Sequence, residues 1–403
     1  MMMDDVRILR LFEYKPLQLP PSELTMADAE IIFREHGDKI EIEEPTMRTG
    51  GLWCLQSKGW VGSIPLRSHL RLHLEPKMSV ASIFRMLEYA YALKSFNILE
   101  GISESDQIDE IYQRLAMVLA RRVLDRGRRG LYRAYVPEED QLPYVRGSVD
   151  IARSLRTPWK VALHCSFREN TADIRENQLL AWTLHTIIRQ GICTGERLDY
   201  VMAAWRSLRG AITLHSFRPA EYIGWLYNRL NGDYRPLHAL CRFFLEQAGP
   251  THEHGGFETI PFLVNMAGLY EKYVAEYLAG KIGDGMSLSG QEDVGVSPDG
   301  KITITIDLVL SDLASGNAIA VLDTKYKNAD YPSPDDLQQV VAYAVAKNCR
   351  RAVLIYPTMP KRPFNGLYGA GHVEVMTSIV SPDGEIGEGL KGMLGIDLPS
   401  TPY

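Results

Sequence analysis

Apolar and polar residues alternate along several segments of the first hundred positions, which is the pattern of half-buried strands. The predicted strands cover 38–44, 53–66 (as two strands around a Lys58-Gly59 turn) and 70–75. Over 80–93 the apolar residues recur at three- and four-residue steps, so a helix is predicted there. We therefore expect a β-rich N-terminal domain over residues 1–110.

The middle of the chain carries helical spacing instead. The predicted helices cover 109–124, 176–189, 220–230 and 237–248. Gly, Pro and polar residues then cluster over 249–256, which indicates a linker. His252 and His254 lie in this cluster without a third metal ligand, so a linker is preferred to a metal site. A helical middle domain over 111–255 is expected.

Helices and strands alternate in the last third of the chain. The predicted elements are a helix over 261–278, strands over 301–310, 318–323 and 351–357, and a helix after Ser333. Ser333-Pro-Asp-Asp336 suits a helix start, because serine accepts an orphan amide, proline fits the first turn, and acids favour the positive end. We expect an α/β domain over 256–403, and a multidomain α+β protein as a whole.

Composition excludes several classes of protein. Of the 403 residues, 45% are hydrophobic and 23% are charged, which argues against a disordered or fibrous chain. No apolar run approaches the roughly 18 residues that span a bilayer, and acids stand where a secretory signal is basic. A cytoplasmic protein with no membrane partner is expected. Five scattered cysteines without C-x-x-C spacing predict reduced, mostly buried thiols.

Charge argues against one mode of nucleic-acid binding and leaves another open. The net charge of -6 excludes coating of nucleic acid by bulk charge, although local charge sets the local field. Residues 118–160 carry ten Arg or Lys against five Asp or Glu, including Arg128 and Arg129. This basic stretch suits contact with DNA phosphates, docking of an acidic partner, or one solvated helix face.

Two acids and a lysine form the strongest chemical signal. Asp307 lies in one alternating strand, and Asp323-Thr324-Lys325 ends the next. Residues two apart on a strand face the same side, so Asp323 and Lys325 point together. If the two strands pair as a hairpin, Asp307 can lie opposite Asp323, and two close carboxylates need a cation between them. Oxygen ligands of this kind suit Mg²⁺ or Mn²⁺.

Two flanking helices extend this set of residues. Glu271 lies on the helix before the first strand, where its carboxylate could hold the metal through water. Gln339 and Tyr343 lie four residues apart on the helix after the second strand, hence on one face. Gln339 could brace a water or Lys325, and Tyr343 could touch a DNA backbone. A water nucleophile, a Lewis acid and a cation are what phosphodiester hydrolysis requires.

The bland alternative is that these residues are solvated strand ends. An Asp-x-Lys triplet occurs by chance roughly once in a chain of this length, so alone it carries no information. The informative feature is the order of elements: a helix with Glu271, a strand with Asp307, a strand that ends in Asp323-Thr-Lys325, and a capped helix with Gln339 and Tyr343.

In this order, residues 262–357 resemble the PD-(D/E)xK nuclease fold, and most of the chain is similar to McrC, the nuclease subunit of McrBC-type modification-dependent restriction systems. The C-terminal motifs that carry the resemblance are Met266-Ala-Gly-Leu-Tyr-Glu-Lys-Tyr-Val274, Ile306-Asp-Leu-Val-Leu310, Val321-Leu-Asp-Thr-Lys-Tyr-Lys327 and Gln339-Val-Val-Ala-Tyr343. The weaker upstream motifs are Gly59-Trp-Val-Gly-Ser-Ile64, Glu75-Pro-Lys77, Val145-Arg-Gly147 and Asp173-Ile-Arg-Glu-Asn177. Ile306 stands where the fold's name expects proline, while Asp307 itself is kept.

The resemblance implies an activity and a set of partners. It implies an antiviral restriction endonuclease that cuts modified double-stranded DNA with Mg²⁺, or Mn²⁺ as a substitute. Asp307, Asp323, the backbone carbonyl of Thr324 and Glu271 would hold the metal, with Lys325 and Gln339 in the catalytic set. Tyr343, Lys327, Arg128 and Arg129 would contact DNA.

The partner that the resemblance implies is an McrB-type AAA+ GTPase hexamer, docked by the N-terminal domain. The chain has no G-x-x-x-x-G-K-[ST] motif, so we expect the motor to be a separate protein. Two alternatives remain: a non-catalytic scaffold that clamps DNA or activates the motor, and a stand-alone repair nuclease.

Overall fold

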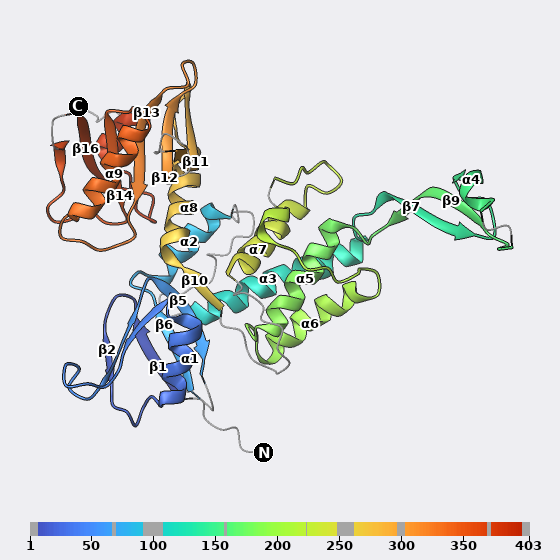
Figure 1. The fold of residues 1–403 in the computed structure, drawn as a ribbon, viewed down its shortest axis with the longest axis horizontal. Helices are drawn as coiled ribbons and strands as arrows, with labels where there is room; N and C mark the ends of the chain where they lie inside the picture. The colour runs from blue at the N-terminus through green and yellow to red at the C-terminus, as the bar shows by residue number, and fades with distance from the viewer. Residues whose placement is uncertain are drawn as a thin grey trace. The chain divides into compact units, whose positions relative to one another are not determined.

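The protein is a mixed α+β chain with several separate sheets (Figure 1). This computed structural model describes residues 7–66, 70–91, 108–156, 159–222, 224–247, 262–295, 303–368 and 372–396. The predicted linker over 249–256, with His252 and His254, lies outside these ranges. No helix within the described ranges is long and apolar enough to cross a membrane.

The chain divides into two compact units, each described here by itself. One unit combines Met1–Ile108 with Leu263–Tyr403, and the other is Asp109–Phe262. The first and last parts of the chain therefore belong to one unit. The predicted division into three domains, at about 110 and 255, stays a prediction.

The N-terminal part of the first unit contains two sheets and two helices. The four-stranded sheet has the order β1-β6-β5-β10, with β1 Arg7–Phe12, β5 Trp60–Pro65, β6 Leu70–Glu75 and β10 Phe262–Asn265. The three-stranded sheet has the order β2-β4-β3, with β2 Leu17–Leu19, β3 Ile40–Glu43 and β4 Trp53–Ser57. The helices are α1 Met26–His36 and α2 Val80–Ala90.

One prediction for this region is correct in its strands and wrong in their pairing. β4 and β5 flank Lys58 and Gly59 as expected, but they do not pair with each other. β4 pairs with β2 and β3, and β5 pairs antiparallel with β6. Gly59, at a φ of 82°, turns the chain from one sheet to the other. A hairpin turn and a turn between sheets have the same local sequence signal.

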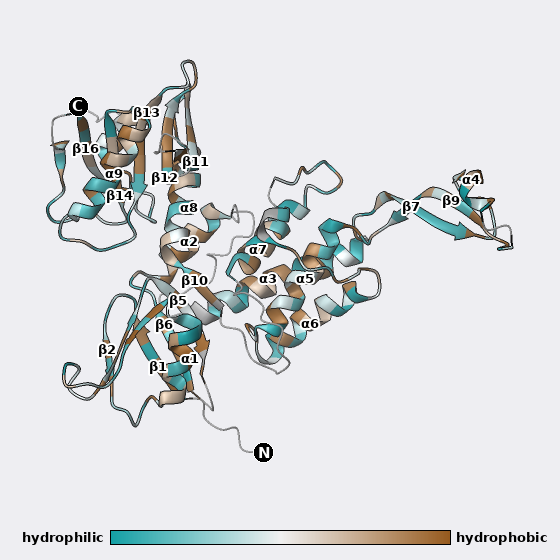
Figure 2. Ribbon diagram, viewed as in Figure 1, coloured by the Kyte–Doolittle hydropathy of each residue, from teal (hydrophilic) through white to brown (hydrophobic). Residues whose placement is uncertain are grey.

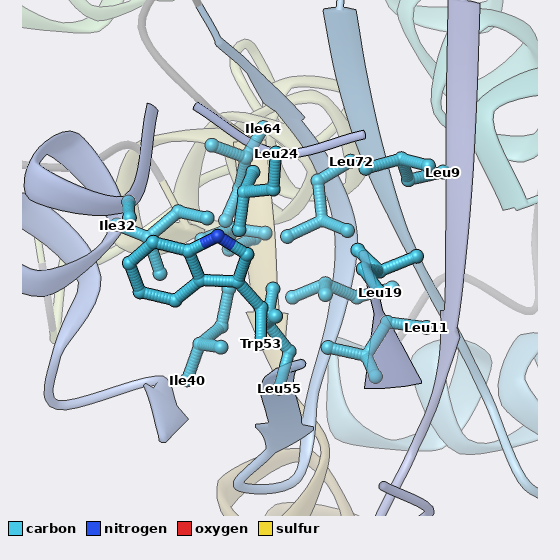
Figure 3. Close-up of a cluster of buried hydrophobic side chains, with 13 residues drawn as sticks. Leu9, Leu11, Leu19, Leu24, Ile32, Ile40, Trp53, Leu55, Ile64 and Leu72 are labelled. Carbon is cyan, nitrogen blue, oxygen red and sulfur yellow. The ribbon is translucent and has the colours of Figure 1, made fainter. Parts of the chain in front are cut away.

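Both N-terminal sheets bury side chains in one hydrophobic core (Figure 3). Trp53 of β4 packs there with Ile32 of α1 and Leu72 of β6. Leu263 of β10 joins the same core, although it follows Leu72 by almost two hundred positions in the chain. The segment that leads into the C-terminal part is therefore held by the N-terminal core.

The C-terminal part is a six-stranded sheet with the order β11-β12-β13-β14-β16-β15. Its strands are β11 Met286–Gly295, β12 Thr303–Asp312, β13 Ala318–Thr324, β14 Arg351–Tyr356, β15 Asn365–Tyr368 and β16 Val373–Ile379. Its helices are α8 Met266–Ala279, α9 Pro334–Ala346 and α10 Glu388–Met393. β11, β12 and β13 are antiparallel, whereas β13, β14 and β16 are parallel. Figure 2 shows hydrophobic residues along the central strands, most of which are fully buried.

The two helices that flank this sheet begin at defined caps. The helix predicted from residue 261 begins at Met266, because 262–265 form β10 and the Asn265 side chain accepts the amide of Gly268 at 3.1 Å. Ser333 forms a reciprocal capping box with Asp336, which confirms the predicted start of α9. α9 packs against β13 and β14, and α8 packs against β11 and β13.

The second unit is helical, with one projecting arm (Figure 1). Its helices are α3 Ile108–Arg129, α5 Arg175–Arg189, α6 Gly195–Arg209 and α7 Tyr234–Gln247. The arm, which was not predicted, pairs β7 Ala134–Leu142 with β9 Leu163–Thr171 and carries β8 Ser148–Val149 and α4 Ile151–Ser154. The helix predicted over 220–230 is wrong: only a 3₁₀ turn, η2 Pro219–Tyr222, forms before Gly224 adopts a φ of 77°.

Buried polar side chains hold α5 and α7 together. Asn177, fully buried, donates to the carbonyls of Tyr132 and Ala172 and accepts from the Tyr234 hydroxyl at 2.6 Å. Asn177 therefore braces the core of this unit. All five cysteines are free and four are buried, as expected.

His238 of α7 is buried in its neutral form. Its Nε2 lies 3.0 Å from the carbonyl of Glu176 and its Nδ1 lies 2.9 Å from the Tyr227 hydroxyl. Because a carbonyl only accepts, Nε2 carries the proton and Nδ1 accepts from tyrosine. Burial lowers the pKa of His238 to about 4.

This lowered pKa predicts that the second unit loses stability in acid. Between the ordinary pKa and the folded one, the unfolded chain binds a proton that the folded chain does not, so stability is present above about pH 6.5 and falls by up to about 3 kcal/mol as the pH drops to about 4. Amide exchange of α5 and α7 peptides in urea, across this range, measures the effect. His238→Gln, which keeps a donor and an acceptor, should flatten the slope. An unchanged slope would contradict the account.

Candidate active site

The β12–β13 hairpin brings the two predicted acids together. Leu308 pairs with Leu322 in the antiparallel ladder, and the next positions outward in the same register are Asp307 and Asp323. The amide and the hydroxyl of Thr324 both donate to Asp307 Oδ2, at 2.9 and 3.0 Å. The Asp307 carboxylate is therefore fixed against the end of β13.

Asp323 is a buried acid with an incomplete set of partners. It is 1% exposed, and no described residue donates a hydrogen bond of good geometry to either of its oxygens. The Lys325 amine lies 2.7 Å from Oδ2 as an ion pair. Burial raises the pKa of Asp323 to about 7, with a smaller contribution from Asp307, although Lys325 opposes the shift. The carboxylate is thus short of positive charge in the folded protein.

Lys325 and Gln339 lie beside this acid. The Lys325 amine donates to Gln339 Oε1 at 2.8 Å, and Gln339 Nε2 donates to the Tyr343 hydroxyl at 2.6 Å. Burial lowers the pKa of Lys325, but Asp323 and its acidic neighbours outweigh burial and leave that pKa raised. Because Gln339 belongs to α9, the Lys325 amine is held by a residue of α9 as well as by Asp323 of β13.

Glu271 reaches the same region from α8. Burial raises the pKa of its carboxyl, and the negative charge of Asp307 raises it further. Its Oε1 accepts a hydrogen bond from Gln291 Nε2. Gln291 lies in β11 opposite Asp307, between the Gly290–Leu308 and Glu292–Ile306 pairs of an unbroken register, and it adopts a φ of 53°.

Sequence reasoning missed Gln291. Nothing in a run of polar residues marks which one will adopt a positive φ, and glutamine is not a residue that favours it. Positive φ at a residue other than glycine is uncommon, and here it occurs at the residue whose side-chain amide donates to Glu271.

The acidic residues suit a divalent cation, but they do not provide a complete set of metal ligands. A buried carboxylate whose burial is only partly offset by one lysine would be stabilised further by a bound cation. Among the described residues, however, no three Asp, Glu, His or Cys side chains are close enough to hold a metal alone. Mg²⁺ suits such a site, because it usually keeps several waters and takes one or two carboxylates plus substrate phosphate oxygens.

Of the four residues predicted to contact DNA, Tyr343 and Lys327 are engaged in contacts within the C-terminal part, whereas Arg128 and Arg129 are exposed. Tyr343 is 7% exposed and supports Gln339. The Lys327 amine lies 2.6 Å from Asp336 Oδ2, and Asp336 forms the capping box of α9. Arg128 and Arg129 are exposed at the end of α3 in the other unit. A role in DNA binding stays a prediction for all four.

Comparison with known proteins identifies the family. Residues 55–357 match the family of the McrBC 5-methylcytosine restriction system component. The type IV methyl-directed restriction enzyme EcoKMcrBC of Escherichia coli (strain K12) is 25% identical over 282 residues, which cover 62% of this chain and 74% of that protein. The chain belongs to the family of McrBC 5-methylcytosine restriction system components.

A solved structure supports the fold. In a half-complex from a tetradecameric assembly of Thermococcus gammatolerans McrB AAA+ hexamers with bound McrC, one chain matches 96% of this chain over 98% of its own length. The TM-score is 0.57 and the sequence identity is 16%, a likeness that concerns the fold alone.

The buried charge of Asp323 predicts that the site sacrifices stability for metal binding. Asp323→Asn should raise the unfolding temperature of the metal-free protein at about pH 8, because burial of the carboxylate outweighs its ion pair with Lys325 and leaves its pKa raised. Mg²⁺ should stabilise the natural protein but not the variant. Thermal unfolding with and without Mg²⁺ measures both.

The matched control is Asp330→Asn, which changes an exposed acid that lies 2.9 Å from Lys361. It should leave both unfolding temperatures unchanged. Equal stabilisation of Asp323→Asn and the natural protein by Mg²⁺ would place the metal elsewhere.

Proposed function

We propose that this chain is the Mg²⁺-dependent endonuclease subunit of an McrBC-type restriction system, cutting DNA together with an McrB-type AAA+ GTPase. The observation that carries the proposal is the convergence of Asp307, Asp323 and Lys325 at the end of one hairpin. Its order of elements is that of the PD-(D/E)xK nuclease fold.

Each residue of the site has a role in hydrolysis that its contacts support. Asp307 and Asp323 would hold Mg²⁺, aided by the Thr324 carbonyl, and Glu271 would hold it through water. A bound Mg²⁺ supplies Lewis-acid polarisation of the scissile phosphate and lowers the pKa of a water. Thr324 and Gln291 orient two of these carboxylates by hydrogen bonds.

Lys325 would act as a cation in this reaction. Its raised pKa favours the ammonium form, which stabilises negative charge as it develops on the phosphoryl oxygens. Gln339 holds the amine in place at 2.8 Å, so little reorganisation is needed at the moment of reaction. Mn²⁺ should replace Mg²⁺, because the ligands are oxygens.

The partner would be an McrB-type AAA+ GTPase hexamer; the complex from Thermococcus gammatolerans contains McrB AAA+ hexamers with bound McrC. Two surfaces of this chain are candidates for docking. The first is the N-terminal part, as the resemblance to McrC implies. The second is the far end of the β7–β9 arm, where Tyr144, Trp159 and Val161 are 57%, 76% and 93% exposed. Clustered exposed apolar residues are typical of protein interfaces.

The central prediction is loss of cleavage on substitution of the site. Asp323→Ala and Lys325→Ala should each lower Mg²⁺-dependent cutting of methylated DNA by the complete complex by at least about a thousandfold, because each removes a group that stabilises the transition state. Binding of the GTPase should be unchanged, since both residues lie in the C-terminal sheet, outside the two candidate docking surfaces, with side chains 1% and 16% exposed. Gel assays of plasmid cleavage measure the first effect, and GTP hydrolysis measures the second.

The controls are Asp330→Ala and Lys361→Ala, an exposed acid and lysine of the same part of the chain. They should cut at the natural rate. Undiminished cutting by both site variants would overturn the active-site assignment. If the natural complex hydrolyses GTP but never cuts, the chain is an activator or a scaffold, and cutting without the GTPase would indicate a stand-alone nuclease.

A further inference from the structure

A buried polar cluster joins the N-terminal part of the first unit to the residue that follows Lys325. Tyr326 is 5% exposed, and its side chain lies among Glu13, which follows β1, and Lys77, which precedes α2. These three residues form the Glu13–Lys77–Tyr326 cluster. Tyr326 is 313 and 249 positions from Glu13 and Lys77 in the chain, yet all three belong to one compact unit.

The contacts within the cluster are specific. The Lys77 amine donates to the backbone carbonyl of Tyr326 at 3.0 Å and lies 3.7 Å from the centre of the Tyr326 ring. Glu13 Oε2 accepts from the Tyr326 hydroxyl and from the Lys77 amide, both at 3.2 Å. Lys77 therefore contacts both the main chain and the ring of Tyr326, and Glu13 accepts a hydrogen bond from its hydroxyl.

Both charged members of the cluster are largely removed from water. Glu13 is 2% exposed. Burial raises the pKa of Glu13 and lowers the pKa of Lys77 to about 8, while each charge partly offsets the shift of the other. A surface pair would gain little from such an arrangement, whereas in a buried pair the loss of one partner leaves an uncompensated charge. Each charged residue therefore needs the other in place, and this favours a single arrangement of the cluster.

The cluster acts on a short turn that carries three side chains in three directions. The Lys325 side chain lies beside Asp323 and Gln339, and Lys327 contacts the start of α9. Tyr326, between them, is the member of the turn that reaches the N-terminal part. The main chain is held by the Lys325 amide on the carbonyl of Ile355 and the Lys327 amide on the carbonyl of Lys325, both at 2.8 Å.

We propose that Lys77 and Glu13 are positioning residues for the cleavage site: through Tyr326 they fix the turn that sets the Lys325 amine against Asp323. The role rests on the proposed function, since it assumes that Lys325 acts in hydrolysis. The reactive amine is then held by the N-terminal part as well as by its own sheet. A displacement of about 1 Å at a catalytic group can reduce a rate a hundredfold.

The test uses the complete complex and separates rate from binding. Lys77→Met keeps an unbranched side chain but removes the amine. It should lower kcat for Mg²⁺-dependent cleavage about ten- to a hundredfold and leave KM for DNA unchanged. Tyr326→Phe, which loses only the hydrogen bond to Glu13, should reduce kcat less. A general loss of fold would also lower the apparent kcat at constant KM, and it is recognised by faster amide exchange throughout the unit.

A second readout does not depend on cleavage. Amide exchange over 324–328 should become several-fold faster in Lys77→Met, while exchange over β12 stays the same. The matched control is Lys281→Met, because the Lys281 amine lies 5.1 Å from the centre of the Tyr277 ring, away from this turn. This control should change neither kcat nor exchange of the turn.

The outcomes are distinct. If the natural complex cuts and Lys77→Met keeps the natural kcat and the natural exchange, the positioning role is wrong. If the natural complex does not cut, the proposed function fails. Unchanged amide exchange over 324–328 in Lys77→Met would then also show that Lys77 does not hold this turn. If Lys77→Met loosens the whole unit, Tyr326→Phe and Glu13→Gln decide, and an unchanged kcat in both would overturn the inference.

Discussion

A carboxylate buried at the end of a hydrophobic strand is the constraint around which the rest of this site is arranged. The three residues before Asp323 in β13 are fully buried, and the acid itself is 1% exposed. A buried charge is costly unless it is paired. Lys325 offsets part of that cost, and Asp307, held by Thr324, adds to it. A buried and only partly compensated charge lowers stability, and it is typical of functional sites such as those that bind a cation.

The core of this site could be predicted because it depends on short-range geometry. The two-residue spacing of Asp323 and Lys325 puts them on one face of a strand, and a short turn after Asp307's strand makes a hairpin the simplest pairing. The cap at Ser333 fixed the phase of α9 and so the place of Gln339. These inferences needed only the period of a strand, the period of a helix and the chemistry of a helix start.

The rest depends on long-range packing that leaves no local signal. β4 and β5 look like a hairpin but join different sheets, and the positive φ of Gln291 leaves no signal in its sequence. The segment over 220–230 has helical spacing, yet it forms only the 3₁₀ turn η2 before Gly224, whose positive φ is incompatible with a continuing helix. Glu13 and Tyr326 meet only because the two ends of the chain form one unit. Tertiary contacts decide such features, whatever the local pattern favours.

The most direct test of the account is the position of a bound metal. Crystals of the protein soaked in Mn²⁺ and measured at the manganese edge locate the ion by its anomalous scattering. The account predicts one strong peak within roughly 2.5 Å of a carboxylate oxygen of both Asp307 and Asp323, with the Lys325 amine nearby. The account would be contradicted if, in a crystal saturated with Mn²⁺, the ordered manganese lay elsewhere and Asp323 were still paired with Lys325 alone.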